Sequence, residues 1–489
     1  MKRYLYLWHR WLGIGMCLLM ALWFVSGVVM LYVGYPKLTQ AEHLSRLPTL
    51  ALTDCCVEPL QILQRMDAHA GVLRLTTVAG EPRYLFTQRG AVHAFDARSG
   101  EPVSAVDVEQ AVASARQFAP GASIAYQRLV DEDTWTHSRG LDADRPLHRL
   151  HIDDAQRRLL YVSSASGAVV RDVTQVERVW NWLGAWLHWI YPLRGNLFNA
   201  AWHDVVVYLS IAGTLTAVLG LVIGLLRWRF GKPYRNGSRS PYRVGWARWH
   251  HIGGLFFGAV LIAWIFSGLM SMRPWDVLAG QSAFSMVAYQ GSHWQESDSG
   301  LTLEEALGRM HAANFRPHEL EWRIVAGQIW LVGYRPDGAT RVISLHQDAE
   351  PAERIAGTTL ELAAQLALPD SSAEFEWLQD YDFYYLNREQ QSMYGARVRP
   401  LPVLRARFDD PASTWVHLDP ATGSVVDVLD QQRRLYRWMF NLLHSWDLPW
   451  LLERPMLREL LIVLFSLGGA VISLSGAVIG WRRLKRVLS

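Results

Sequence analysis

Four long runs of apolar residues divide the chain. They cover roughly residues 11–35, 203–226, 252–272 and 457–481. Each run is near the ~20 residues that an α-helix needs to cross the hydrocarbon core of a bilayer, so the pattern predicts four transmembrane helices. The first run is longer than the apolar part of a signal peptide, and no small-x-small cleavage motif follows it, so we expect an uncleaved anchor.

The two segments between these runs, about 36–200 and 273–455, have the mixed patterns of small α+β domains. In TWVHLDPATGSVVDV (414–428), two β-prone stretches flank D-P and T-G turn signals, which predicts a β-hairpin. RLLYVSSASGAVVRDV (158–173) has the same pattern. We therefore expect a membrane protein with four transmembrane α-helices and two external α+β domains.

The positions of the charged residues predict the orientation in the membrane. The segment 227–249, between the second and third runs, has seven Lys and Arg residues and no acidic residue, and both chain ends are basic. The positive-inside rule places these basic parts in the cytoplasm and the acid-containing domains outside. The predicted units are helix 1 (1–35), domain 1 (36–200), helix 2 (201–228), a cytoplasmic loop (229–248), helix 3 (249–272), domain 2 (273–455), and helix 4 with a cytoplasmic tail (456–489).

Composition excludes some classes of protein and cofactor. Half of the 489 residues are hydrophobic, and the 23 Trp residues suit membrane–water interfaces. The three cysteines do not form a disulfide framework: Cys17 lies in an apolar run, and Cys55 and Cys56 are two thiols, a vicinal disulfide or a weak metal site. The sequence has no CxxCH motif, which excludes covalent c-type haem, and no nucleotide-binding glycine loop. We expect no nucleic acid partner.

The two halves of the chain resemble each other. LWHRWLGIGMCLLMALWFVSGV (7–28) matches RWHHIGGLFFGAVLIAWIFSGL (248–269) at an offset of 241 residues, and the second and fourth runs match at an offset of 256. Two parallel copies of this kind are related by a pseudo-two-fold axis along the membrane normal. The coinciding residues include Trp8/Trp249, His9/His250, Gly13/Gly254, Trp23/Trp264, His188/His444, Gly220/Gly476 and Gly224/Gly480.

Two of the coinciding histidines lie near the cytoplasmic ends of the first and third runs. The pseudo-two-fold axis would place His9 opposite His250 at one depth, and two facing imidazoles can clamp a flat metallo-macrocycle from both sides. Gly13 and Gly254 lie one turn further along the same helical faces, where they would leave room for it. His251 is the alternate to His250, but one residue turns a helical side chain by ~100°, so both cannot face the axis. An interfacial histidine that binds nothing is the competing interpretation of each.

A second pair is expected near the outer surface. His188 and His444 each end an aromatic, interfacial segment, RVWNWLGAWLHWIYP (178–192) and RLYRWMFNLLHSWDLP (434–449), shortly before a returning run. Their equivalence favours a second clamp, and His203, at the start of the second run, is the alternate ligand. The histidines of the external segments have no ligand spacing and are expected at the surface: His43, His69, His93, His137, His148, His151 and His417.

Two pairs of glycines lie near the inner surface at small-xxx-small spacing. They are Gly220 with Gly224 and Gly476 with Gly480. Such pairs allow helices to approach closely, and they would equally make space for the inner macrocycle. The sequence leaves both interpretations open.

Several motifs together give the chain a family resemblance. They are HRWLG near the N-terminus, DYDFYY (380–385), VHLDPATGSVVDVLD, RWMFNLLHSWDLPW and SLGGAVISLSGAVIGWRRLKR. With these motifs the chain resembles the PepSY-associated transmembrane proteins of bacterial inner membranes, over nearly its whole length and most strongly in the C-terminal half. Some members of that family are similar to haem-containing reductases that pass electrons across the membrane to a ferric siderophore in the periplasm.

The resemblance implies a di-haem electron-transfer protein, an oxidoreductase of iron acquisition in the bacterial inner membrane. Both termini would be cytoplasmic, and the PepSY-like domains would be periplasmic. Electrons would come from a cytoplasmic reductase or a membrane quinol and would pass to a ferric siderophore or another ferric chelate. Four histidines would ligate the irons of two b-type haems: His9, His250, His188 and His444.

The acceptor would bind between the external domains, and the resemblance places its contacts on the second domain. The first half departs from the DYDFYY motif and has VDEDTWTH (130–137) in its place. The candidate substrate contacts are Asp380, Asp382, Tyr384 and Tyr385.

A different class of function fits the same sequence. In that alternative, the chain is a non-redox, membrane-anchored PepSY binding or regulatory protein whose external domains bind a peptide or a protease and whose histidines only pack. A transporter fits less well, because the four runs offer no acidic or polar pathway through the membrane. Haem content separates the first two classes.

Overall fold

The computed structural model describes residues 2–50, 55–66, 71–88, 90–194, 199–291, 300–393, 395 and 398–488. Within these ranges, four helices are long and apolar enough to cross a membrane, which confirms the four predicted runs. Three of the four helices continue beyond their apolar run into a basic flanking segment. There the backbone keeps its helical hydrogen bonds, while water and lipid headgroups can solvate the charged side chains. The four helices are α1 (Lys2–Tyr32), α7 (Trp202–Arg227), α8 (Trp246–Ser271) and α15 (Pro455–Leu488).

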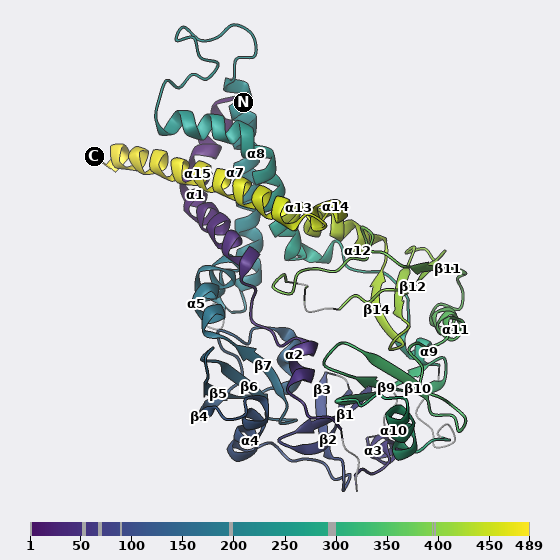
Figure 1. Cartoon of the computed structure of the whole chain (residues 1–489). Coiled ribbons are helices and arrows are strands. Elements are labelled where there is room, and N and C mark those ends of the chain that lie inside the picture. Colours follow the sequence, from purple (N-terminus) through teal and green to yellow (C-terminus); the bar gives the residue numbers. More distant parts are fainter. Residues whose placement is uncertain are drawn as a thin grey trace.

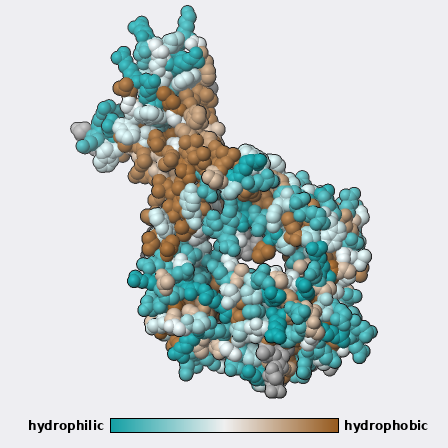
Figure 2. Space-filling model, in the orientation of Figure 1, coloured by the Kyte–Doolittle hydropathy of each residue, from teal (hydrophilic) through white to brown (hydrophobic). Residues whose placement is uncertain are grey.

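The four helices form a bundle in which α1 packs against α15 and α7, and α8 packs against the same two helices. Both chain ends and the loop between α7 and α8 lie at one end of the bundle, called the loop end below, and the sheets lie at the other, the domain end (Figure 1). On the face shown in Figure 2, a hydrophobic band covers the bundle between two hydrophilic regions. This band is the surface that a bilayer would cover. The buried core of the bundle includes Met16, Met20, Phe24, Leu261, Trp264 and Ile265.

A six-stranded antiparallel sheet at the domain end is built from both halves of the chain. Its order is β10-β9-β8-β1-β2-β3, and the halves meet where Arg74 of β1 pairs with Glu321 of β8. Both halves also contribute side chains to the core that this sheet covers. The strands are β1 (Val72–Val78), β2 (Glu81–Gln88), β3 (Ala91–Asp96), β8 (Glu319–Val325), β9 (Gln328–Tyr334) and β10 (Thr340–Ser344).

Each half also has a four-stranded antiparallel sheet of its own. The predicted hairpins are confirmed, and Gly167 and Gly423 adopt φ of 75° and 70° in their turns, a conformation that glycine adopts without steric cost. The first sheet is β4 (Ser123–Val130), β5 (Leu147–Asp153), β6 (Leu159–Ser163) and β7 (Val169–Val173). The second is β11 (Ala373–Leu378), β12 (Val403–Phe408), β13 (Trp415–Asp419) and β14 (Ser424–Leu429).

Helices cover these sheets and connect them to the bundle. The covering helices are α2 (Gln40–Ser45), α3 (Pro59–Arg65), α4 (Val108–Phe118), η1 (Arg139–Asp144), α9 (Met286–Gln290), α10 (Leu303–Ala312) and α11 (Gly357–Ala367). The connecting helices are α5 (Gln175–Leu183), α6 (Ala185–His188), η2 (Tyr191–Leu193), η3 (Pro274–Asp276), α12 (Gln431–Tyr436), η5 (Arg437–Leu442), α13 (Leu443–Ser445) and α14 (Pro449–Leu452). Because α6 packs on α1 and α13 packs near the end of α8, the two aromatic segments lie against the bundle.

The structure chooses among the three interpretations of the adjacent cysteines. The sulfurs of Cys55 and Cys56 are bonded to each other, so the pair is a vicinal disulfide. It packs against the core shared by the two halves. Cys17 is a free, buried thiol in α1, as its apolar surroundings predict.

Candidate functional site

The structure brings His9 of α1 and His250 of α8 together inside the bundle near the loop end. Their ring centroids lie 6.2 Å apart, with the ring planes at 35°. Nδ1 of His9 donates to the carbonyl oxygen of Thr216 at 3.1 Å, and Nδ1 of His250 donates to that of Ile472 at 3.0 Å. Since Nδ1 carries the proton in each ring, the lone pair of Nε2 is available to a ligand.

The two rings line a cavity of about 460 Å³ between the four membrane helices. This volume falls within the range of about 300–1,000 Å³ that is usual for small-molecule and cofactor sites. A Cβ added to Gly254 would meet no atom within 4 Å, and one on Gly13 would meet only Sγ of Cys17 at 3.9 Å. Both glycines therefore border open space, as expected for residues that leave room for a ligand.

The glycines of the two small-xxx-small pairs have two different roles. A Cβ on Gly220 would lie 2.7 Å from Cε1 of His9, so this glycine leaves room for the ring. A Cβ on Gly476 would lie 2.5 Å from Sγ of Cys17 and 3.1 Å from Cε1 of His250, so this glycine leaves room for the thiol and for the ring. A Cβ on Gly224 would instead lie 3.1 Å from Leu255 of α8. Likewise, a Cβ on Gly480 would lie 3.0 Å from Ile14 of α1. The first glycine of each pair thus makes space at the cavity, and the second allows two helices to approach.

The second predicted pair also meets, at the domain end of the bundle. The rings of His188 and His444 have centroids 6.1 Å apart, with the planes at 73°. Nδ1 of His188 lies 3.0 Å from Oγ of Ser26, which itself donates to the carbonyl of Trp23. Because that hydroxyl proton is already used, the Ser26 oxygen accepts from Nδ1–H, and Nε2 of His188 again has the free lone pair.

His444 is held in the same way. Its Nδ1 lies 3.0 Å from Oγ of Ser267, and this hydroxyl donates to the carbonyl of Trp264. Two residues after each histidine the backbone turns left-handed, at Ile190 (φ 55°) and Trp446 (φ 51°). This turn ends each short helix and redirects the chain towards the next membrane helix.

The spacing within both pairs fits a shared metal. Two imidazoles that bind one metal ion with bonds of about 2.0 Å have ring centroids roughly 6 Å apart. Among the described residues, no group of three or more His, Cys, Asp or Glu side chains could hold a metal ion. A pair of histidines is sufficient when a macrocycle supplies the remaining ligands, as in bis-histidine haem.

The comparisons with known proteins identify the family. The model of the PepSY-associated TM region matches residues 6–483. The chain belongs to the PepSY-associated TM family. The match covers α7, α8 and most of α1 and α15, and it includes both histidine pairs of this PepSY-associated TM protein. A search of curated proteins found no significant match.

The structure gives the two alternate histidines other roles in the PepSY-associated TM protein. Nδ1 of the buried His251 lies 2.8 Å from Oγ of Ser240, and its Nε2 donates to the carbonyl of Gly224 at 3.0 Å, so protein atoms occupy both ring nitrogens. His203 is exposed, and its Nε2 donates to the carbonyl of Met272 at 2.9 Å. Neither residue is brought opposite a second histidine.

The four residues expected at the acceptor surface differ in exposure: Asp380 is exposed, Asp382 and Tyr384 are half-buried, and Tyr385 is buried. Oδ2 of Asp382 lies 2.6 Å from Nη2 of Arg405, and its Oδ1 accepts the backbone N–H groups of Tyr384 and Tyr385. Tyr385 is completely buried, so it is not available at a docking surface. The placement of this residue at the surface is corrected, because its phenol donates to a backbone carbonyl in the interior.

Three of the external histidines are buried rather than at the surface: His137, His148 and His417. Nε2 of His417 accepts a hydrogen bond of 2.8 Å from Nε of Arg405. Burial, together with the nearby guanidinium charges of Arg405, Arg399 and Arg407, lowers the pKa of His417 to about 2. His417 is therefore a neutral acceptor that stabilises the sheet. His69 lies outside the described residues.

A buried charge network, which the sequence patterns did not reveal, holds the turn after His444. Oδ2 of Asp447 lies 3.0 Å from Arg437 and 3.2 Å from Arg388. Arg458, at the start of α15, pairs with Glu389 at 2.6 Å and donates to the carbonyl of Ser445. The network joins the loop after DYDFYY to the turn that carries the histidine. The one local sign of this network in the sequence is Asp447, an acidic residue three positions after His444.

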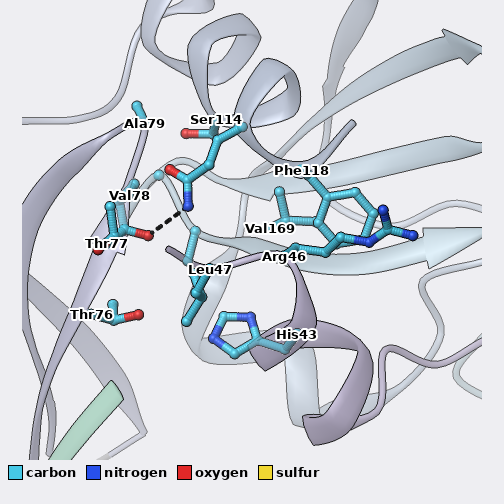
Figure 3. Close-up of a pocket in the computed structure, with 13 residues that line it drawn as sticks. His43, Arg46, Leu47, Thr76, Thr77, Val78, Ala79, Ser114, Phe118 and Val169 are labelled. Carbon is cyan, nitrogen blue, oxygen red and sulfur yellow. Dashed lines mark hydrogen bonds between the residues drawn. The ribbon is translucent and has the colours of Figure 1, made fainter. Parts of the chain in front are cut away.

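A second, much smaller pocket lies between α2, β1 and α4 (Figure 3). Its volume is about 20 Å³, which is room for about one water molecule. A hydrogen bond from the side-chain amide of Gln117 to the carbonyl of Thr77 crosses it, and Phe118 and Val169 form its apolar wall. The large cavity beside His9 and His250 is therefore the stronger candidate for a ligand site.

Proposed function

We propose that this PepSY-associated TM protein binds two b-type haems, one between His9 and His250 and one between His188 and His444, and conducts electrons across the membrane. The observation that supports this most is the geometry shared by the two pairs, with ring centroids 6.2 and 6.1 Å apart. In each ring, protein oxygens hold Nδ1 and leave Nε2 free.

When bound, haem supplies one-electron redox chemistry, and two histidine ligands leave the iron no open position for oxygen. The carbonyls of Thr216 and Ile472 and the hydroxyls of Ser26 and Ser267 would orient the rings and make them more basic. The buried core between the two levels excludes water. These residues therefore suit electron transfer better than oxygen activation.

Aromatic side chains lie between the two levels of the bundle. Trp264 packs against Phe24, with ring centroids 6.0 Å apart, and against Trp446, with centroids 5.7 Å apart. Nε1 of Trp23 donates to the carbonyl of His188 at 3.0 Å, which links the middle of α1 to the domain-end pair. In the proposal, this dense packing holds the two levels at a constant separation.

The basic loop and termini support an orientation with the loop end in the cytoplasm of a bacterial inner membrane. The sheets would then be periplasmic. A cytoplasmic reductase or a membrane quinol would reduce the loop-end haem. The domain-end haem would reduce a ferric siderophore or another ferric chelate in iron acquisition, as the family resemblance implies.

Spectroscopy of the purified protein tests this proposal. After expression with sufficient haem, the protein should be red, with a Soret band and, on dithionite reduction, the sharp α-band of low-spin haem. The pyridine haemochrome assay should give two haem b per chain. A colourless protein that is folded would contradict the proposal and favour the non-redox PepSY alternative.

Substitution of Gly220 by Ala is expected to lower the haem content from two towards one per chain. The new Cβ would lie 2.7 Å from Cε1 of His9, closer than such atoms normally approach, so the ring must move from its position. Gly15→Ala is the matched control, since a Cβ there would meet no atom within 4 Å. Two haems retained in Gly220→Ala, with an unchanged α-band, would show that Gly220 does not position the ligand.

A further inference from the structure

The mouth of the large cavity carries positive charge. Three arginines line it: Arg10, Arg227 and Arg483. Arg227 is the last residue of α7, and Arg483 lies in the terminal part of α15. Nη1 of Arg227 donates to the hydroxyl of Tyr242 at 2.8 Å, and its guanidinium lies 4.6 Å from the ring centroid of Tyr6. This arginine is therefore held at the cavity by its neighbours.

The sequence provides no acid near these arginines. The four membrane helices and the loop between α7 and α8 contain two acidic residues, Asp204 and Glu459, and both lie at the domain end. Arg227 is half-buried and Arg483 is exposed, and this part of the chain offers neither guanidinium group a carboxylate partner. Such a site favours an anionic ligand, because bidentate pairing with a carboxylate satisfies the planar guanidinium.

The positions of two of the arginines match those of the glycines beneath the rings. Arg227 follows Gly220 by seven residues, and Arg483 follows Gly476 by seven. Seven residues are about two helical turns, so each arginine lies on the same helix face as its glycine and roughly 10 Å nearer the loop end. The two cations therefore flank the cavity from α7 and α15, above the two imidazoles.

We propose that Arg227 and Arg483 bind the two propionate carboxylates of the macrocycle held between His9 and His250. Haem b has two apolar edges and one edge with both propionates, so two cations at one mouth orient the charged edge towards the loop end. This inference rests on the proposed function. It adds that two residues other than the iron ligands bind the carboxylates of the haem.

These arginines could instead act at the membrane surface, and the two roles predict different ligand affinities when the arginines are replaced. Basic residues at this end of a membrane protein commonly set its orientation or contact anionic lipid headgroups, and the loop has further arginines that suffice for that purpose. Arg482 is an exposed residue of the same helix turn as Arg483 that does not line the cavity. It serves as the matched control for charge at this surface.

The test compares haem with haem dimethyl ester, in which both propionates are uncharged. Full-length protein with His444→Ala, which leaves the loop-end pair as the one complete pair, is prepared without haem and titrated with each compound. Haem should bind about tenfold more tightly than the ester or better, as expected for charge-assisted hydrogen bonds. The Arg227→Gln/Arg483→Gln variant should lose this preference, and Arg482→Gln should retain it. The readout is the Soret titration and needs no electron acceptor.

The outcomes distinguish the two proposals. Equal affinity for haem and its dimethyl ester in the protein with intact arginines overturns the propionate assignment and leaves haem binding supported, whether or not the arginine variant folds. Equal loss of affinity for both compounds in the arginine variant assigns these residues to folding or to lipid headgroups and also overturns it. If neither compound binds to folded protein, both proposals are wrong.

Discussion

Replacement of His9 or of His250 by alanine is expected to remove one haem from the protein and to leave the other in place. In the proposal, each imidazole would supply one of the two ligands at the loop end. The ring centroids lie 6.2 Å apart, and both Nδ1 atoms are hydrogen-bonded to backbone carbonyls. Loss of one ring would remove half of the protein ligands that the cavity offers to the iron. The haem content should fall from two to about one per chain, as measured by the pyridine haemochrome assay.

His251→Ala is the control that makes this result specific. His251 is adjacent to His250 and is buried, but its ring nitrogens bond to Ser240 and to the carbonyl of Gly224. Its removal should destabilise the connection between the loop and α7 and leave two haems bound. If His251→Ala loses a haem and His250→Ala keeps both, the ligand assignment on α8 is wrong.

Replacement of His188 or of His444 by alanine is expected to remove the other haem. These rings lie 6.1 Å apart, and the hydroxyls of Ser26 and Ser267 hold them against α1 and α8. The remaining haem should keep a low-spin spectrum, because the loop-end pair is intact. The absorption spectra of the His9→Ala and His188→Ala proteins should therefore add to that of the wild type, and each variant should keep one of its reduction potentials.

His203→Ala is the matching control at the domain end. His203 is exposed, and its contacts are with the carbonyl of Met272 and the carboxylate of Asp204. The variant should retain both haems and the wild-type reduction potentials. Loss of one haem in His203→Ala, with both retained in His188→Ala, would move the outer ligand to α7.

Each pair takes one histidine from each half of the chain. His9 and His188 come from the first half, and His250 and His444 from the second. Neither half alone would therefore complete a bis-histidine site. The pairing of β1 with β8 joins the halves a second time, at the domain end, which gives the structure two separate constraints on how they are positioned.

The sequence by itself determined the elements whose signals are local. The four membrane helices follow from the length of their apolar runs, and the hairpins of β6–β7 and β13–β14 follow from alternating residues around a glycine turn. The offsets of 241 and 256 residues also predicted which histidines meet, and the rings of both pairs lie close together. The repeat and its pseudo-two-fold axis stay predictions. Their role as haem ligands stays a prediction.

Only the tertiary structure decided the features that depend on contacts between distant segments. These include the sheet shared by both halves, the burial of Tyr385 and His417, and the different roles of Gly220 and Gly224. A glycine at a ring and a glycine at a helix crossing have the same sequence pattern. They differ in which side chain of another helix lies where their Cβ would be. Tertiary packing determines that neighbour.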